Sequence, residues 1–186
     1  MGSRTSIAAA MAVTLSSCAT PQPSILDRFE ATLARHHSAT AAMEEWCAAE
    51  HIAASPDIRA VPAPGPDMQA SDDVRTALRV TADERLGYRH VLLTCGGKVL
   101  SVAHNWYVPA RLTAAMNRTL EGSDAPFGKV VVPLQYTREE QPAHRGGDAA
   151  CPAGTVLTKG AVLRLPDGTP ISLVIECYTP EILGAQ

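Results

Sequence analysis

Apolar and polar residues follow a strand-like pattern most clearly in the middle of the chain. Two runs rich in β-branched and apolar residues, 88–94 and 99–108, flank Gly96 and Gly97. Glycine adopts the positive φ angles that tight hairpin turns need, so the pattern predicts a β-hairpin. Proline at position 109 has no N–H to donate to a neighbouring strand, so the second strand is expected to end there.

Arg89 lies within the first of these runs. Side chains alternate between the two faces of a strand, which places Arg89 on the face that carries Val91, Leu93 and Cys95. An arginine on an otherwise apolar face either lies at the edge of the sheet or binds a buried anion. Both interpretations stay open at this point.

A second hairpin is expected near the C-terminus, with strands at residues 155–165 and 169–178 and a turn at residues 166–168. Glu176 is the only carboxylate in the apolar run of its last strand. A buried carboxylate is costly unless it is paired or protonated. We therefore expect Arg89 to share a cavity with Glu176, either directly or through a ligand.

The remaining elements follow from helical spacing of apolar residues and from the positions of proline and glycine. Helices are expected at residues 25–37, 41–52, 71–78 and 109–120. Strands are expected at residues 57–61 and 129–136, and a polar, mobile loop at residues 139–154. The combination predicts a single domain of the α+β class.

The N-terminus has the pattern of an export signal. Arg4 precedes an uncharged apolar run at residues 7–15, and the sequence Leu-Ser-Ser-Cys that ends at Cys18 resembles the lipobox of bacterial lipoproteins. The alternative is a chance cysteine in a frayed start. The expected organisation is a signal peptide at residues 1–17, a tether at 18–23 and the folded domain at 24–186. Lipidation of Cys18 would anchor the protein in a membrane of the cell envelope, facing the periplasm.

Composition narrows the function classes. The 186 residues are 46% hydrophobic and 19% charged, which suits one globular domain. The net charge is −3, aromatic residues make up only 4%, and no cluster of lysine and arginine stands out. These features argue against a nucleic-acid-binding protein. The histidines are scattered without ligand spacing, so we expect no metal site and no cofactor.

Export would place four cysteines in an oxidising compartment, where they can form disulfides. Four cysteines allow three connectivities. Cys95 and Cys177 lie in apolar strand segments typical of core residues, Cys151 lies in the expected loop and Cys47 on an expected helix. Cys47–Cys151 is therefore the expected pair.

Several motifs together resemble chorismate pyruvate-lyase, the enzyme that splits chorismate into 4-hydroxybenzoate and pyruvate. They are RHVLLTC at residues 89–95, YVP at 107–109, PFG at 126–128 and a hairpin of the LRL…E…P type at 163–180. The order of the motifs agrees over about residues 24–180. This superfamily also includes effector-binding domains of bacterial transcription regulators. The resemblance implies a chorismate lyase-like α+β fold with an antiparallel sheet and flanking helices.

The resemblance also implies a site. In the family an arginine holds the ligand carboxylate, assisted by backbone N–H groups, and a glutamate accepts a hydrogen bond from the ring hydroxyl. The corresponding positions are Arg89, Glu176 and the backbone of Ala39, Phe127 and Gly128. Arg89 and Glu176 are thus the candidate catalytic residues, and all five are candidate binding residues. A guanidinium binds a carboxylate through two parallel hydrogen bonds, which suits this role.

Three functions stay open. The first is lyase activity on chorismate, and the second is binding or sensing of a small aromatic acid by a membrane-anchored protein without turnover. The third is a structural or interaction module in which Arg89 and Glu176 form a buried ion pair. The Arg-Thr pair that the family carries before its V-P motif is missing here. The loss of a positive charge favours a monocarboxylate over chorismate, which has two carboxylates.

Overall fold

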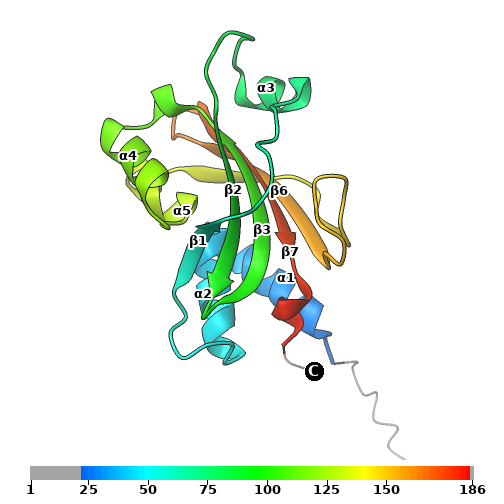
Figure 1. Cartoon of the computed structure of the whole chain (residues 1–186). Coiled ribbons are helices and arrows are strands. Elements are labelled where there is room, and N and C mark those ends of the chain that lie inside the picture. Colours follow the sequence, from blue (N-terminus) through cyan, green and yellow to red (C-terminus); the bar gives the residue numbers. More distant parts are fainter. Residues whose placement is uncertain (1–21, 185–186) are drawn as a thin grey trace, which may run out of the picture.

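A seven-stranded antiparallel sheet forms the centre of the computed structural model, which describes residues 22–184 (Figure 1). The expected signal peptide and Cys18 lie outside these residues. The strand order is β1-β2-β3-β7-β6-β4, and β5 also pairs with β6. The strands are β1 (Ile58–Pro62), β2 (Gly87–Cys95), β3 (Lys98–Tyr107), β4 (Thr137–Glu140), β5 (His144–Arg145), β6 (Leu157–Arg164) and β7 (Pro170–Tyr178).

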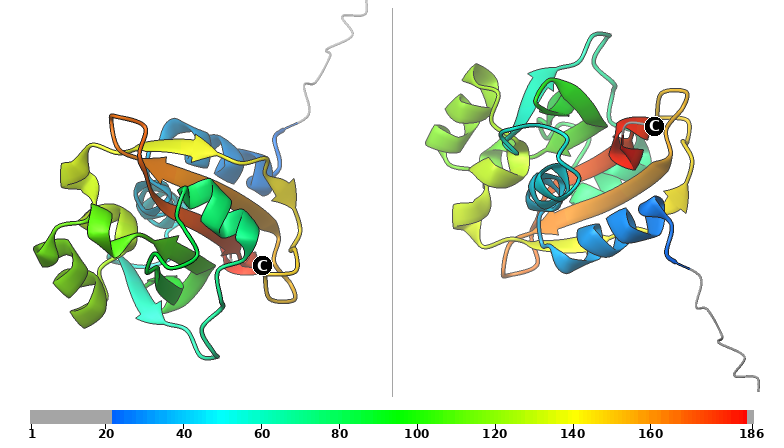
Figure 2. Two further views of the ribbon diagram at one scale, coloured as in Figure 1. Left: turned by 90° about the horizontal axis from the view of Figure 1, so that it is seen from above. Right: turned by 90° about the horizontal axis from the view of Figure 1, so that it is seen from below.

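Helices cover both faces of this sheet. They are α1 (Ile25–Arg35), α2 (Ala39–Ala49), α3 (Asp72–Leu78), α4 (Ala114–Gly122) and α5 (Phe127–Val130), with 3₁₀ turns η1 (Pro109–Arg111), η2 (Val132–Leu134) and η3 (Pro180–Leu183). Helices α1 and α3 lie on opposite sides of β6 and β7 (Figure 2). The expected α+β class with an antiparallel sheet and flanking helices is confirmed.

The two predicted hairpins are present. Strands β2 and β3 meet at a turn in which Gly96 and Gly97 have φ of 56° and 85°, the left-handed values that favour glycine. Strands β6 and β7 meet at a turn in which Gly168 has φ of 83°. Each strand pairs mainly with a neighbour close in sequence, so local pattern was sufficient to predict both.

The face of β2 that carries Arg89 is the face covered by α1 and α2. Phe29 of α1 is fully buried there and makes edge-to-face contacts with Trp46 of α2 and with Tyr178 of β7, at ring centroid distances of 5.1 and 5.0 Å. Val91 is buried in the same cluster. Burial of large aromatic rings stabilises this layer by the hydrophobic effect. This core also holds in place the face of the sheet on which the candidate site residues lie.

The opposite face of the sheet carries a smaller core. Val74 and Leu78 of α3 pack against Trp106 of β3 and Leu173 of β7. The Trp106 indole N–H donates to the carbonyl oxygen of Met68, at 3.1 Å, which holds the segment before α3 against the sheet. The two faces are therefore separate, and only the α1–α2 face leads to the candidate site.

The expected strand at residues 129–136 is wrong. The segment instead forms α5 and the 3₁₀ turn η2, and Pro133 lies in the first turn of η2. Proline lacks an N–H and suits the first positions of a helical turn, where no donor is required. Gln135 then adopts a left-handed conformation, with φ of 55°, and ends the turn. The apolar side chains of this segment cover the sheet rather than extending it.

The expected loop at residues 139–154 is only partly a loop. Strand β4 begins at Thr137 and runs to Glu140, and β5 adds two further residues, both paired with β6. The expected helix at residues 109–120 is divided into η1 and α4, with Thr113 capping α4 through the N–H of Met116. Strands β4 and β5 were missed because charged residues on a sheet edge resemble loop residues.

The expected Cys47–Cys151 disulfide is also wrong. The structure has Cys47 bonded to Cys95 and Cys151 bonded to Cys177. Helix α2 lies near the end of β2, which brings Cys47 to Cys95, and the segment before β6 lies beside β7. An apolar strand context does not distinguish a core thiol from half of a disulfide. Separately, none of the helices within residues 22–184 has the length and apolar character needed to cross a membrane.

Candidate ligand-binding site

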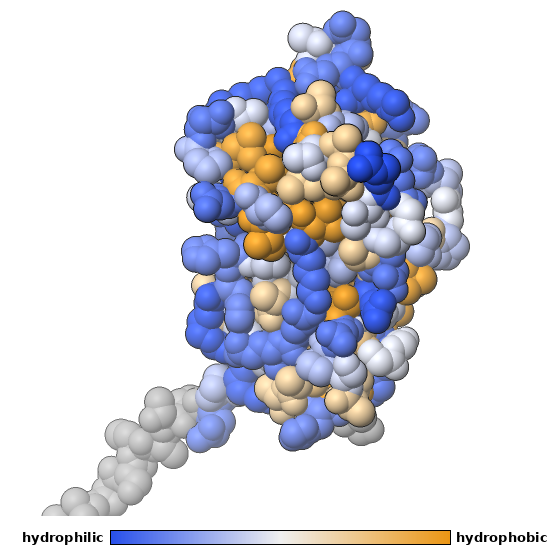
Figure 3. Space-filling view, turned by 90° about the vertical axis from the view of Figure 1, so that its left-hand side faces the viewer, coloured by the Kyte–Doolittle hydropathy of each residue, from blue (hydrophilic) through white to orange (hydrophobic). Residues whose placement is uncertain are grey.

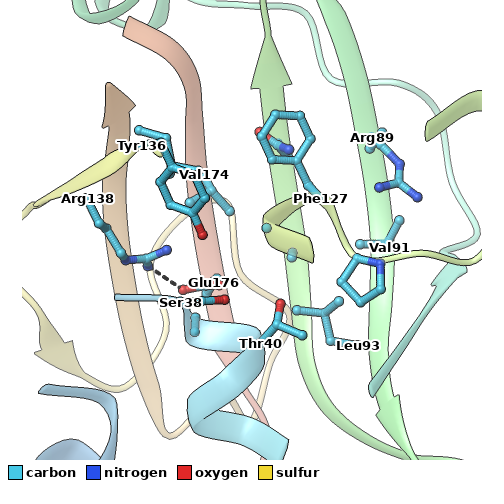
Figure 4. Close-up of a pocket in the computed structure, with 16 residues that line it drawn as sticks. Ser38, Thr40, Arg89, Val91, Leu93, Phe127, Tyr136, Arg138, Val174 and Glu176 are labelled. Atoms are coloured by element: carbon cyan, nitrogen blue, oxygen red, sulfur yellow. Dashed lines mark hydrogen bonds and ion pairs between the residues drawn. The ribbon is translucent and has the colours of Figure 1, made fainter. Parts of the chain in front are cut away.

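A cavity lies between the α1–α2 face of the sheet, the start of α2 and the short helix α5 (Figure 4). All five candidate residues from the sequence contribute to its lining: Ala39, Arg89, Phe127, Gly128 and Glu176. Its volume is about 50 Å³. One ordered water needs roughly 10–15 Å³ on this measure, so the space suits a small molecule. Its other walls are largely apolar, including Val91, Leu93, Leu163 and Val174.

Glu176 is paired, but its partner is not Arg89. An Nη2 donor of Arg138 lies 2.7 Å from Oε2 of Glu176, and the side chains are only 8% and 6% exposed. The hydroxyl of Tyr178 donates to the same oxygen at 3.1 Å. Arg138 also contacts Glu140 at 2.6 Å. The direct Arg89–Glu176 pair that the sequence left open is therefore absent, because Arg138 occupies that role.

The pair between Arg138 and Glu176 is electrostatically strong. Burial alone would lower the pKa of Arg138, but the adjacent Glu176 carboxylate and Tyr178 raise it above its ordinary value. Burial, followed by the charge of Glu176, raises the pKa of Tyr178 well above its usual range. Both groups therefore hold their protons at neutral pH and donate to the carboxylate. Neither hydrogen bond uses Oε1 of Glu176.

Arg89 is in a different situation at the other end of the cavity (Figure 4). Its Nη1 donates to the backbone carbonyl of Ala125 at 3.1 Å, and none of the described carboxylates forms an ion pair with it. Burial lowers the pKa of Arg89. The group nevertheless stays charged at neutral pH, because an arginine guanidinium is not deprotonated in proteins. The cavity therefore contains a positive charge without a protein counter-charge among residues 22–184.

The sheet register separates the two ends. Arg89 pairs with Asn105 across β2 and β3, whereas Glu176 pairs with Ala103 one row further along. With strands about 4.8 Å apart and about 6.8 Å per two residues, the Cα atoms of Arg89 and Glu176 are roughly 12 Å apart. The two charged groups thus face the same space from opposite ends.

The start of α2 and helix α5 close the cavity from the side opposite the sheet. Ser38 caps α2, and its hydroxyl accepts from the N–H of Ala41 at 3.5 Å. A Cβ atom at Gly128 would lie 3.2 Å from Oγ of Ser38 and 3.3 Å from the hydroxyl of Tyr136. Glycine at this position therefore permits the close approach of α5 to α2. The first N–H groups of a helix have no intrahelical partner, so α2 can offer donors at Ala39.

Sequence reasoning missed five polar residues of the lining: Ser38, Thr40, Asn105, Tyr136 and Arg138. Arg138 lies between the expected strand at residues 129–136 and the expected loop at residues 139–154. Tyr136 and Arg138 are two residues apart, which is the spacing of side chains on one face of a strand. Burial raises the pKa of Tyr136, so its hydroxyl remains protonated at neutral pH. No group of three or more metal-ligating side chains occurs within residues 22–184.

The surface beside the cavity is unusually apolar. On the side of the molecule where α4 and α5 lie, a continuous hydrophobic area interrupts a largely hydrophilic surface (Figure 3). Val132, in the turn that follows α5, is 58% exposed. This area adjoins the segment that covers the site.

Two solved structures have a similar fold. The structure is similar to that of PhnF from Mycobacterium smegmatis, with a TM-score of 0.55 and 14% identity over 78% of this chain and 65% of PhnF. The effector domain of PhnF gives a TM-score of 0.52 and 13% identity, over 67% of this chain and 82% of that domain. The chain therefore has the same fold as the effector domain of PhnF.

The relationship in sequence is more specific. The chain is 38% identical over 178 residues to the uncharacterized protein y4mC of Sinorhizobium fredii (strain NBRC 101917 / NGR234), covering 86% of this chain and 75% of y4mC. It belongs to the same family as y4mC. No protein-family model matches the chain. The chain spans less than two thirds of the length of two of the solved structures that it matches, 65% of PhnF and 59% of the possible transcriptional regulator YydK from Bacillus subtilis.

Proposed function

We propose that this domain binds a small aromatic carboxylate in the cavity between the sheet, α2 and α5. The observation that carries the proposal is Arg89, a charged guanidinium in a mainly apolar cavity without a carboxylate partner among residues 22–184. Arg89 is half-buried, and a charge held in a largely apolar cavity without a counter-charge has an energetic cost that an anionic ligand would reduce. Arg89 would hold the carboxylate, with support from backbone N–H groups of Ala39, Phe127 and Gly128.

Glu176 is suited to the far end of such a ligand. Its Oε2 accepts from Arg138 and Tyr178, and Oε1 makes no hydrogen bond with the described residues. A ring hydroxyl could therefore donate to Oε1. Fold similarity alone does not establish function, and the regulator effector domains support small-molecule binding only by analogy.

We favour binding over conversion of chorismate to 4-hydroxybenzoate and pyruvate. Chorismate carries two carboxylates, whereas only one cavity cation, Arg89, is free to balance a ligand charge. Arg138 is already compensated by Glu176 and Glu140.

The proposed location is the cell envelope, with a lipid anchor on Cys18. Support comes from the lipobox-like sequence at residues 15–18 and from the two disulfides, because disulfides persist in oxidising compartments. A sensor or carrier of a small acid outside the cytoplasm fits this location. A lyase does not, since its substrate is a cytoplasmic intermediate.

Isothermal titration calorimetry of the oxidised domain with 4-hydroxybenzoate tests the proposal. We expect saturable binding by the wild type and a loss of at least about 10-fold in affinity for Arg89→Met, because a charge-assisted hydrogen bond contributes roughly 1.5–3 kcal/mol. Arg59→Met changes an exposed arginine and is the control. Equal affinity of the wild type and Arg89→Met would contradict the proposed site.

Incubation with chorismate distinguishes the enzyme from the binding protein. The proposal predicts no 4-hydroxybenzoate above the spontaneous rate, measured by chromatography. Turnover that Arg89→Met abolishes would establish the lyase instead.

A further inference from the structure

We infer that Asn105 is the second ligand-binding donor of this cavity and that it restricts the site to acids with a single carboxylate. The inference rests on the proposed function, because it specifies how the same site selects its ligand. Asn105 is only 3% exposed and belongs to the lining of the cavity. Its Nδ2 is buried and has no hydrogen-bond partner among the described residues.

The oxygen of the Asn105 amide faces Ser172 in the structure. The hydroxyl of Ser172, a fully buried residue on β7, donates to Oδ1 of Asn105. An amide has one acceptor end and one donor end, so this bond leaves the NH₂ group of Asn105 without a partner. A buried donor that lacks a partner destabilises the folded protein. A ligand that accepts from this group would remove that penalty.

Asn105 is also in the correct place to act with Arg89. The two residues are direct partners across β2 and β3, so their side chains lie on one face. Cβ atoms of such partners are about 4.5–5.5 Å apart. A carboxylate next to Arg89 is therefore within reach of the Asn105 amide. One of its oxygens would accept from the guanidinium and the other from Nδ2.

The neutrality of Asn105 sets the charge of the ligand. The charged side chains that line the cavity are Arg89, Arg138 and Glu176, and the last two form an ion pair. One positive charge remains. A second carboxylate on the ligand would enter a largely apolar space without a counter-charge, which is strongly unfavourable. The site is therefore built for a monocarboxylic acid with an apolar ring.

Calorimetric titration of the wild type with 4-hydroxybenzoate and with 4-hydroxyisophthalate tests the charge selection directly. The second acid has the same ring and hydroxyl and one more carboxylate. We expect it to bind at least about 10-fold more weakly. Equal or tighter binding of the diacid would overturn the inference, and this comparison requires no variant.

A double variant, Asn105→Leu with Ser172→Ala, tests the donor. Replacing both partners of a buried hydrogen bond with apolar groups is close to neutral for stability, whereas replacing one is not. We expect the double variant to keep its unfolding midpoint and to bind 4-hydroxybenzoate roughly 10- to 100-fold more weakly. Ser172→Ala alone keeps the donor and should show a smaller loss. Gln69→Leu, a matched amide replacement at an exposed position, is the control.

The outcomes separate this inference from the proposed function. If the wild type binds neither acid, the proposed function fails. If the wild type binds 4-hydroxybenzoate and the folded double variant binds it equally well, Asn105 is not a ligand donor and only the inference fails. If the double variant does not fold, the wild-type comparison of the two acids decides.

Discussion

At the level of single residues, two arginines of one cavity have opposite roles. Arg138 is buried with Glu176 and Tyr178, whereas Arg89 contacts only a backbone carbonyl among the described residues. The sequence revealed Arg89 and Glu176, because each is conspicuous in an apolar strand. It did not reveal Arg138, whose neighbours are all polar. Arg138 is the partner of Glu176 because of the strand order. This order places β4, which carries Arg138, beside β6 and thus near β7, which carries Glu176.

This contrast predicts different effects on stability. Arg138→Met should lower the free energy of unfolding by about 3–5 kcal/mol, because it leaves Glu176 as an unpaired buried charge. Arg89→Met should lower it much less, since no ion pair is lost. Urea unfolding followed by circular dichroism measures both. A loss for Arg89→Met as large as that for Arg138→Met would contradict the assignment.

The double variant Arg138→Met with Glu176→Leu provides the internal control. Replacing both charges with apolar groups should recover much of the stability that Arg138→Met loses. If the double variant is as unstable as the single, the loss comes from packing rather than from the unpaired charge.

Two stacked histidines on the opposite face of the sheet predict a pH effect. The rings of His90 and His104 lie 4.4 Å apart, and the Tyr88 hydroxyl contacts Nδ1 of His104 at 2.8 Å. Burial lowers the pKa of both histidines, and His90 lowers that of His104 further, while Asp67 and Asp148 oppose these shifts in part. The unfolded chain therefore binds protons more readily than the folded chain.

Stability should consequently fall as the pH drops below about 6.5, the ordinary pKa of histidine. Urea unfolding at pH 7.5 and pH 5.5 measures this change. His90→Leu removes one of the two groups and keeps the contact between Tyr88 and His104, so its loss of stability between these pH values should be smaller. An identical loss in the wild type and in His90→Leu would show that the pair is not responsible.

At the level of elements, the pairing of strands close in sequence was predictable, whereas the packing of segments far apart in sequence was not. The β2–β3 and β6–β7 hairpins follow from alternation and turn residues. The segment at residues 129–136 has the composition of a strand, but it covers the sheet as α5 and η2 because its proline suits a helical turn and the sheet below needs an apolar cover. Disulfide pairing likewise depends on which elements pack together.

The two disulfides predict a large contribution to stability. Their sequence separations are 48 residues for Cys47–Cys95 and 26 for Cys151–Cys177. Loop-closure entropy then gives about 4 and 3.5 kcal/mol, respectively. Replacing Cys47 and Cys95 together with serine should lower the free energy of unfolding by up to that amount. Chemical unfolding with and without reductant is the measurement.

Peptide mapping without reduction checks the connectivity itself. Cross-linked peptides should join Cys47 to Cys95 and Cys151 to Cys177. A peptide that joins Cys47 to Cys151 would contradict this pairing, and alkylation of all four thiols without reductant would show that the disulfides do not form.

At the scale of the whole molecule, the order of several weak motifs identified the fold better than any one of them. The fold could be predicted because strand and turn motifs occur in a fixed sequence along the chain. The charge distribution of the site could not, since it depends on Arg138 and Asn105, which approach their partners only in the folded sheet. The residues that we propose distinguish one ligand from another thus lie where sequence patterns are least informative.

The lipobox-like sequence predicts membrane attachment of the whole protein. Cys18→Ala should move the protein from the membrane fraction to the soluble fraction, because lipidation of this cysteine would be lost. Immunoblots of fractionated cells that express the wild type or the variant are the measurement. The same distribution for both proteins would show that Cys18 is not the anchor.

The outer strands of the sheet have a consequence for behaviour at high concentration. The free edge of β1 is occupied in part by the carbonyl of Asp124, which accepts from the N–H of Ala60 at 2.7 Å, and the strand ends at Pro62. At the other side, β4 is only four residues long and three of them are charged. Unpaired, flat edges promote strand addition between molecules, whereas short, charged or proline-terminated edges resist it. Both borders therefore oppose aggregation through strand addition between molecules.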